Sequence, residues 1–118
     1  MSVPLQNYLR TYRKRSGLTQ TEVAFLLGSD DGMKVYRYER QVQRPTLETV
    51  LAFEAIFRVP AKELFAGLYR KVEKETRARA LMLAQQLIPA KTMRVTLRKL
   101  ATLQHLSGLA STVTRHHS

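Results

Sequence analysis

The sequence lacks cysteine and tryptophan altogether, and acidic residues, glycines and prolines are few. The absence of cysteine excludes a disulfide framework, a thiolate zinc site and a cysteine nucleophile. No apolar run approaches the roughly 20 residues that a helix needs to cross a bilayer, and the amino terminus lacks the layout of a secretory signal. We therefore expect a cytoplasmic protein that neither spans a membrane nor is exported.

Charge of one sign dominates. The 118 residues include 20 Lys and Arg against 9 Asp and Glu, for a formal net charge of +11. Such an excess favours a polyanionic partner, of which nucleic acid is the commonest. Apolar residues make up 44% of the chain, so it can bury a core and is not a disordered basic tail. The excess is uneven: residues 1–68 hold 10 basic and 7 acidic side chains, whereas residues 69–118 hold 10 and 2.

Helical periodicity runs through almost the whole chain, because apolar side chains recur at three and four residues and no stretch alternates with period two. The predicted fold class is therefore all-α. Before Pro60 we expect four helices: residues 4–15, a short helix that ends near Leu27, a third that runs to about Gln41, and a fourth that opens at Thr46.

Capping residues set the expected helix starts and ends. Ser2 is expected to cap the first helix, with Pro4 in its first turn, and Gly17 supplies a left-handed exit. Thr19 and Glu22 are spaced as a capping box for the second helix.

Beyond Pro60 a fifth helix is expected to continue from about residue 61 to 88, which is longer than a small core requires. A sixth helix is expected after Pro89 and ends near Gly108. We interpret residues 69–108 as a helical extension and residues 109–118 as a frayed tail.

Two short helices joined by a tight turn, the second rich in long polar side chains, are typical of a pair that places one helix in the DNA major groove. The second and third predicted helices fit this description. The segments that carry the pattern are Gly17-Leu18-Thr19-Gln20, Val23-Ala24 with Leu27-Gly28, Val35-Tyr36-Arg37-Tyr38-Glu39-Arg40 and Pro45-Thr46-Leu47-Glu48-Thr49. In this order and spacing they resemble the phage-repressor and Cro-like helix-turn-helix family, also called the xenobiotic-response-element type, over about residues 5–66.

The resemblance implies a four- to five-helix repressor-like domain over residues 1–68 that binds DNA through its third helix. The helical C-terminal extension expected from periodicity follows this domain. The chain departs from the family pattern between Gly28 and Val35, where it is one residue longer. The turn at residues 29–32, or the start of the third helix, must therefore differ.

The faces of the third helix follow from a rotation of about 100° per residue. One side is apolar and is expected to pack inward, whereas the opposite side carries long polar side chains and is expected to face outward. The inward residues are Val35, Tyr38, Glu39 and Val42; the outward residues are Met33, Arg37 and Arg40, with Lys34, Tyr36 and Gln41 beside them.

The outward side has the chemistry of base reading, because Arg can bind guanine bidentately and Met can touch a thymine methyl group. The expected base contacts are Arg37 above all, Met33, Lys34, Tyr36 and, by the resemblance, Gln20. Phosphate contacts are expected near the starts of the second and fourth helices, from Thr19, Arg40, Gln43, Arg44 and Thr46. The alternatives are a solvated basic face on the third helix and capping alone by the two threonines.

Glu39 would be repelled by phosphates unless it points inward and is paired, and its phase places it inward. The resemblance implies that its partner is Arg13 of the first helix. Asp30 and Asp31 are expected to cap the third helix, with a bond from a cytosine amino group to Asp31 as the alternative. Ala24 is interpreted as a small residue where the second and third helices approach closely.

Two functions fit the extension, namely dimerisation and additional phosphate binding. Half-sites on B-DNA lie about 34 to 36 Å apart, so a protein that reads two of them needs a two-fold interface. The apolar series expected to serve it is Leu97, Leu100, Leu103 and Leu106. A solvated charge face explains most of the basic residues Arg70, Lys71, Lys74, Arg77 and Arg79, although no acidic residue follows Glu75.

An enzyme is not expected, because His105, His116 and His117 all lie late in the chain and no carboxylate pair accompanies a base. No metal site, cofactor or small-molecule ligand is indicated. An RNA-binding or antitoxin-like interaction module is the alternative, although the chain lacks the exposed aromatic series that stacks on single-stranded RNA. A basic tail that lies on an anionic membrane is a third possibility.

The sequence thus predicts a homodimeric transcriptional regulator of bacterial or phage type, a repressor that binds an inverted-repeat operator in double-stranded DNA. Its expected location is the bacterial cytoplasm or nucleoid.

Overall fold

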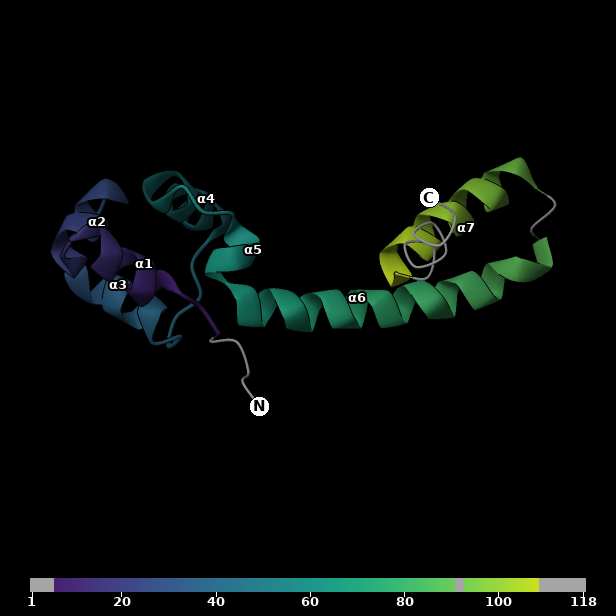
Figure 1. Ribbon diagram of the computed structural model, residues 1–118, viewed down its shortest axis with the longest axis horizontal. Helices are drawn as coiled ribbons and strands as arrows, with labels where there is room; N and C mark the ends of the chain where they lie inside the picture. Colours follow the sequence, from purple (N-terminus) through teal and green to yellow (C-terminus); the bar gives the residue numbers. More distant parts are fainter. Residues whose placement is uncertain (1–5, 91–92, 109–118) are drawn as a thin grey trace. The chain divides into compact units, whose positions relative to one another are not determined.

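The computed structural model describes residues 6–90 and 93–108 (Figure 1). Within these ranges the regular structure is helical and no strand occurs, which confirms the predicted all-α class. The elements are α1 (Leu9–Ser16), α2 (Gln20–Leu26), α3 (Gly32–Glu39), α4 (Leu47–Phe57), α5 (Ala61–Leu64), α6 (Ala66–Leu87), the 3-10 turn η1 (Ile88–Ala90) and α7 (Arg94–Ser107). The chain divides into two compact units, Met1–Arg70 and Lys71–Ser118.

Helix α1 begins at Leu9 rather than near residue 4. The Asn7 side chain explains the late start, because its Oδ1 accepts the backbone N–H of Leu9 at 3.2 Å and its Nδ2 donates to the carbonyl oxygen of Tyr38 at 3.0 Å. The backbone N–H of Tyr8 donates to the carbonyl oxygen of Leu64 at 2.7 Å. These long-range bonds keep residues 6–8 out of the helix, so the prediction was wrong there.

The predicted caps of α2 and α4 are confirmed. Thr19 Oγ1 accepts the N–H of Glu22 at 3.0 Å, and Glu22 Oε1 accepts the N–H of Thr19 at 2.8 Å, which completes the capping box. Thr46 Oγ1 accepts the N–H of Thr49 at 3.2 Å. The predicted cap Ser2, the adjoining Pro4 and the tail at 109–118 lie outside the described residues.

Residues in the left-handed conformation end several helices. Gly17 at φ 79° ends α1 and Gly108 at φ 87° ends α7, both as predicted. Gln41 adopts φ 62°, so the third helix ends at Glu39 rather than near Gln41.

The long helix predicted over residues 61–88 is interrupted at Phe65, whose φ of −115° and ψ of 47° are not helical. The interruption coincides with two hydrogen bonds to the start of the chain. The carbonyl oxygen of Leu64 accepts from Tyr8, and the N–H of Gly67 donates to the carbonyl oxygen of Gln6 at 3.2 Å. A single continuous helix was therefore the wrong prediction, because the partners that break it are distant in sequence.

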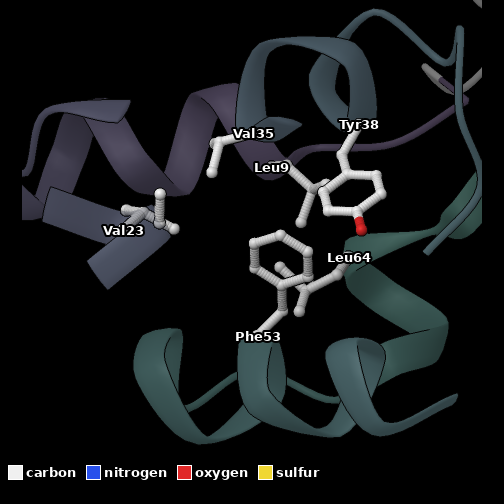
Figure 2. Packing of buried hydrophobic residues seen from close by; sticks show 7 residues of the cluster. Leu9, Val23, Val35, Tyr38, Phe53 and Leu64 are labelled. Carbon is white, nitrogen blue, oxygen red and sulfur yellow. The ribbon is translucent and has the colours of Figure 1, made fainter. Parts of the chain in front are cut away.

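The core of the first unit surrounds Phe53 of α4, which is fully buried (Figure 2). Its ring meets Tyr38 edge-on at 5.9 Å between centroids, and Phe57 and Phe65 at 6.1 and 6.4 Å. Each such aromatic pair contributes about 0.5 to 1.5 kcal/mol beyond its buried area. The other buried members of the cluster are Leu9, Val23, Ala24, Val35 and Leu64. This core fixes α3 against α1 and α4.

The second unit contains the C-terminal part of α6 together with α7 (Figure 1). Ala80, Thr96 and Leu103 are buried in it. Many of its larger apolar side chains are exposed, namely Leu81, Met82, Leu83, Ile88, Met93, Val95, Leu97 and Leu106. In the part of the chain that the structure describes, no helix combines the length and the hydropathy needed to cross a bilayer.

Candidate nucleic-acid interface

Helices α2 and α3 approach each other closely at the start of α3. An ideal Cβ on Gly32 would lie 2.9 Å from Thr21 Oγ1 and 3.3 Å from the Thr21 backbone, which is closer than side chains normally come. Ala24 is fully buried, as its predicted position at the approach requires. The sequence predicted Gly32 only as a turn residue, and its close packing against α2 was not predicted.

The turn before α3 is where the sequence predicts one residue more than the family pattern. The N–H of Ser29 donates to the carbonyl oxygen of Ala24 at 2.8 Å, and Ser29 Oγ accepts the N–H of Asp31 at 3.1 Å. Asp31 Oδ1 then accepts the N–H of Met33 at 3.0 Å and caps the helix. No hydrogen bond of Asp30 is found among the described residues. Of the two predicted caps, Asp31 is confirmed and Asp30 is not.

Glu39 and Arg13 form a buried ion pair, as the family resemblance implied. Their side chains are 2% and 9% exposed. The carboxylate of Glu39 accepts from Arg13 Nε at 2.5 Å, from Arg13 Nη2 at 3.2 Å and from Gln20 Nε2 at 3.2 Å. Arg13 Nη1 donates to the carbonyl oxygen of Leu18 at 3.1 Å. The pair ties α1 to α3 and withdraws the only acidic side chain within α3 from the surface.

The two predicted sides of α3 are largely confirmed. Val35 and Tyr38 are buried, whereas Met33 is 55% exposed and Arg40 is also exposed. Val42 was predicted to face inward and is 73% exposed. That prediction was wrong because the left-handed residue before Val42 ends the helical phase from which it was derived.

Arg37 lies on the outward side, with a side chain that is 38% exposed. Its guanidinium already has partners within the protein. Nε donates to Gln43 Oε1 at 3.2 Å, and Nη2 donates to Asp31 Oδ2 at 3.2 Å. The residue expected to read a base is therefore held by one residue that caps its own helix and one that lies beyond the end of it, which was not predicted from the sequence.

The other predicted base-contacting side chains differ in how accessible they are. Tyr36 is 38% exposed, and the guanidinium of Arg40 lies 5.7 Å from the centre of its ring. Lys34 is half-buried. The amide of Gln20 donates to Glu39, so one of its polar groups is engaged inside the protein. Base contacts by Met33 and these three residues stay predictions.

The predicted phosphate-contacting residues are exposed at the surface, namely Thr19, Arg40, Gln43, Arg44 and Thr46. The hydroxyls of Thr19 and Thr46 accept from backbone N–H groups as helix caps. Capping and phosphate binding remain compatible, because the free N–H groups at each helix start are separate from the hydroxyl that caps it.

An open hollow of about 810 Å³ lies between α1, the start of α2 and the end of α3. Two exposed basic residues of α1 that the sequence analysis did not single out, Arg10 and Lys14, line it together with Thr19, Tyr36 and Arg40. Their spacing of four residues places them on one face of α1, which was the available sequence signal. The hollow thus brings the cations Arg10, Lys14 and Arg40 together beside the start of α2.

No three His, Cys, Asp or Glu side chains in residues 6–90 and 93–108 lie close enough to hold a metal ion. His116 and His117 lie outside the described residues. Comparison with protein families matches residues 9–64, the span from α1 to α5, to the Helix-turn-helix family. Comparisons with curated proteins and with solved structures give no significant match.

Proposed function

Residues 9–64 of this chain are a helix-turn-helix domain of the Cro and phage-repressor type, and from this premise we propose that the protein is a sequence-specific repressor that binds double-stranded DNA. A domain of this family indicates a DNA-binding transcriptional regulator, and its members are typically not enzymes. We extend this to a cytoplasmic homodimer that binds an inverted-repeat operator through α3.

The burial of Glu39 carries the proposal. A helix that lies in the major groove faces phosphates on both sides, so an exposed carboxylate on its last turn would oppose binding. Here the carboxylate is neutralised by Arg13, and the exposed side of α3 presents Met33, Arg37 and Arg40 instead. This arrangement supports base reading by α3 and phosphate contacts by the cations around the hollow.

Fluorescence anisotropy with labelled duplexes tests this function. Duplexes selected from a random pool and unselected duplexes are titrated across a range of salt concentrations. We expect tighter binding to selected duplexes and a log-log salt slope of several units. Equal affinity for every duplex would reduce the protein to a non-specific binder, and a preference for single-stranded RNA would favour the RNA-binding alternative.

Arg37→Ala should cost about 1 to 3 kcal/mol on a selected duplex and relax the preference at one base pair, because the change removes a base contact. Lys62→Ala is the matched control, since Lys62 is exposed on α5 and its replacement removes the same charge outside α3. If both variants lose affinity equally on every duplex, Arg37 contributes charge alone.

We also propose that the second unit holds two copies of the chain together. Many of its larger apolar side chains on α6 and α7 are exposed, and apolar surface gathered on two neighbouring helices is typical of a protein–protein interface. A small hollow of about 380 Å³ between these helices, lined by Leu83, Leu87 and Leu103 among others, adds apolar surface. A two-fold interface of this kind would set the distance between two recognition helices.

Sedimentation analysis of the full chain tests the dimer. Leu97→Lys should shift the protein toward its monomer mass of 13.6 kDa, because Leu97 is 52% exposed on α7 and belongs to the apolar series. His105→Lys adds the same charge at an exposed position on the side of α7 opposite this series and should leave the mass unchanged. A wild-type chain that sediments as a monomer, both alone and on a duplex with two half-sites, would exclude the proposal.

A further inference from the structure

Two side chains from opposite ends of α3 converge on the guanidinium of Arg37. Asp31 caps the first turn, and its two carboxylate oxygens have separate tasks: Oδ1 accepts the N–H of Met33 and Oδ2 accepts Arg37 Nη2. Gln43 lies beyond the end of the helix, and its Oε1 accepts Arg37 Nε. Because Oδ1 is anchored to the helix start, the position of Oδ2 is fixed as well.

The bonds occupy one edge of the guanidinium and leave another available. In arginine, Nε and Nη2 donate from one edge of the planar group, and Nη1 and Nη2 donate from the adjacent edge. Asp31 and Gln43 take donors of the first edge, at 3.2 Å each. Nη1 has no hydrogen-bond partner in the described part of the chain. The available edge has the two parallel donors that match the O6 and N7 acceptors of guanine.

We propose that Asp31 and Gln43 are positioning residues that determine specificity, because they hold Arg37 with its Nη1 and Nη2 edge ready for one guanine. The inference rests on the proposed function, in which Arg37 reads a base. We call Asp31 and Gln43 the brace of Arg37. The brace orders the long Arg37 side chain before DNA binds, so that less conformational entropy is lost on binding. Gln43 retains its amide Nε2 as a donor, which is compatible with the phosphate contact predicted for the same residue.

The brace is expected to act on recognition more than on folding. The Arg37 and Asp31 side chains are 38% and 49% exposed, and ion pairs this open to solvent stabilise a fold very little. When a side chain with many rotamers becomes immobilised on binding, the affinity falls by about 2- to 10-fold. The effect should appear at the single base pair that Arg37 contacts.

Asp31→Asn separates the brace from the cap. Asn is as good an N-cap as Asp, so the bond to Met33 can persist, but the amide that replaces Oδ2 cannot accept from Arg37. We expect Asp31→Asn to lower the preference for guanine at the Arg37 base pair by about 2- to 10-fold, with an unchanged thermal midpoint. Asp30→Asn is the control, since it removes the same charge from the neighbouring residue, which makes no hydrogen bond within the described ranges.

The measurement compares four proteins on one selected duplex and on versions with each base pair replaced in turn: wild type, Arg37→Ala, Asp31→Asn and Asp30→Asn. If Arg37→Ala relaxes a guanine preference and Asp31→Asn leaves it intact, the brace is refuted and the base contact stands. If Arg37→Ala changes no preference at any position, the base contact fails and the inference fails with it. Equal losses for Asp31→Asn and Asp30→Asn would reduce the effect to charge and also overturn the brace.

A second readout needs no DNA. In the free protein, nuclear magnetic resonance of the Arg37 Nε–H group should show slow exchange with water and hindered rotation of the guanidinium. Asp31→Asn and Gln43→Ala should each make proton exchange of the Arg37 Nε–H group and rotation of its guanidinium faster, whereas Asp30→Asn should not. An Arg37 signal that is as mobile as that of exposed Arg44 in the wild-type protein would refute the brace directly.

Discussion

Replacing Glu39 with Met should destabilise the first unit by about 3 to 5 kcal/mol, because the change leaves the Arg13 charge buried without its counter-ion. Three hydrogen bonds to the carboxylate disappear, two of them from Arg13, which keeps the carbonyl oxygen of Leu18 as its acceptor. A unit of this size is stable by about 4 to 10 kcal/mol in all. One substitution therefore removes a large share of its stability.

Tyrosine fluorescence during urea unfolding of the full chain measures this loss, because all five tyrosines lie in the first unit. Arg13→Met should cost a similar amount, since it leaves the Glu39 carboxylate buried with Gln20 as its donor. The double variant, with Met at both positions, should be more stable than either single variant because no unpaired charge remains. A loss below about 1 kcal/mol in either single variant, or additive losses in the double variant, would refute the reasoning.

Four further substitutions test the fold and the interface. Gly32→Ala should cost about 1 to 3 kcal/mol in urea unfolding, because its Cβ would press on Thr21, and a neutral effect would show that α2 and α3 can separate freely. Val35→Thr buries a hydroxyl and should cost about 1 to 3 kcal/mol, whereas Val42→Thr at an exposed position should change stability by less than about 0.5 kcal/mol; equal costs would contradict the observed end of α3. Arg44→Ala should weaken all duplexes alike and lower the salt slope by about one unit, and a change in base preference would reassign Arg44 to base reading.

Local signals were sufficient for most helix boundaries in the first unit. Thr19 with Glu22, Thr46 and Gly17 act within a few residues of their own positions, and the structure confirms each of them. The start of α1 and the break at Phe65 were not predictable in this way. Both depend on hydrogen bonds between residues 6–8 and distant parts of the chain, which leave no mark in local periodicity.

The candidate site, too, could be predicted from the sequence only in part. The inward phase of Glu39 followed from helix geometry and its partner from the family resemblance, and both are confirmed. The bonds of Arg37 to Asp31 and Gln43 could not be predicted from the sequence. Gln43 lies beyond the left-handed Gln41, where helical phase no longer gives the direction of a side chain. The role of Gly32 depends on the distance between two helices, which no spacing within one helix reveals.

The three hydrogen bonds that residues 6–8 make to distant parts of the chain bear on how the domain can be excised. The family match covers residues 9–64. It omits Tyr8, whose N–H donates to Leu64, and Asn7, whose amide donates to the carbonyl oxygen of Tyr38 near the end of α3. It also omits Gly67, the partner of Gln6. A fragment cut at residues 9 and 64 would therefore lose these three hydrogen bonds between its two ends and the rest of the domain, whereas a fragment from residue 6 to residue 67 retains the groups that make them.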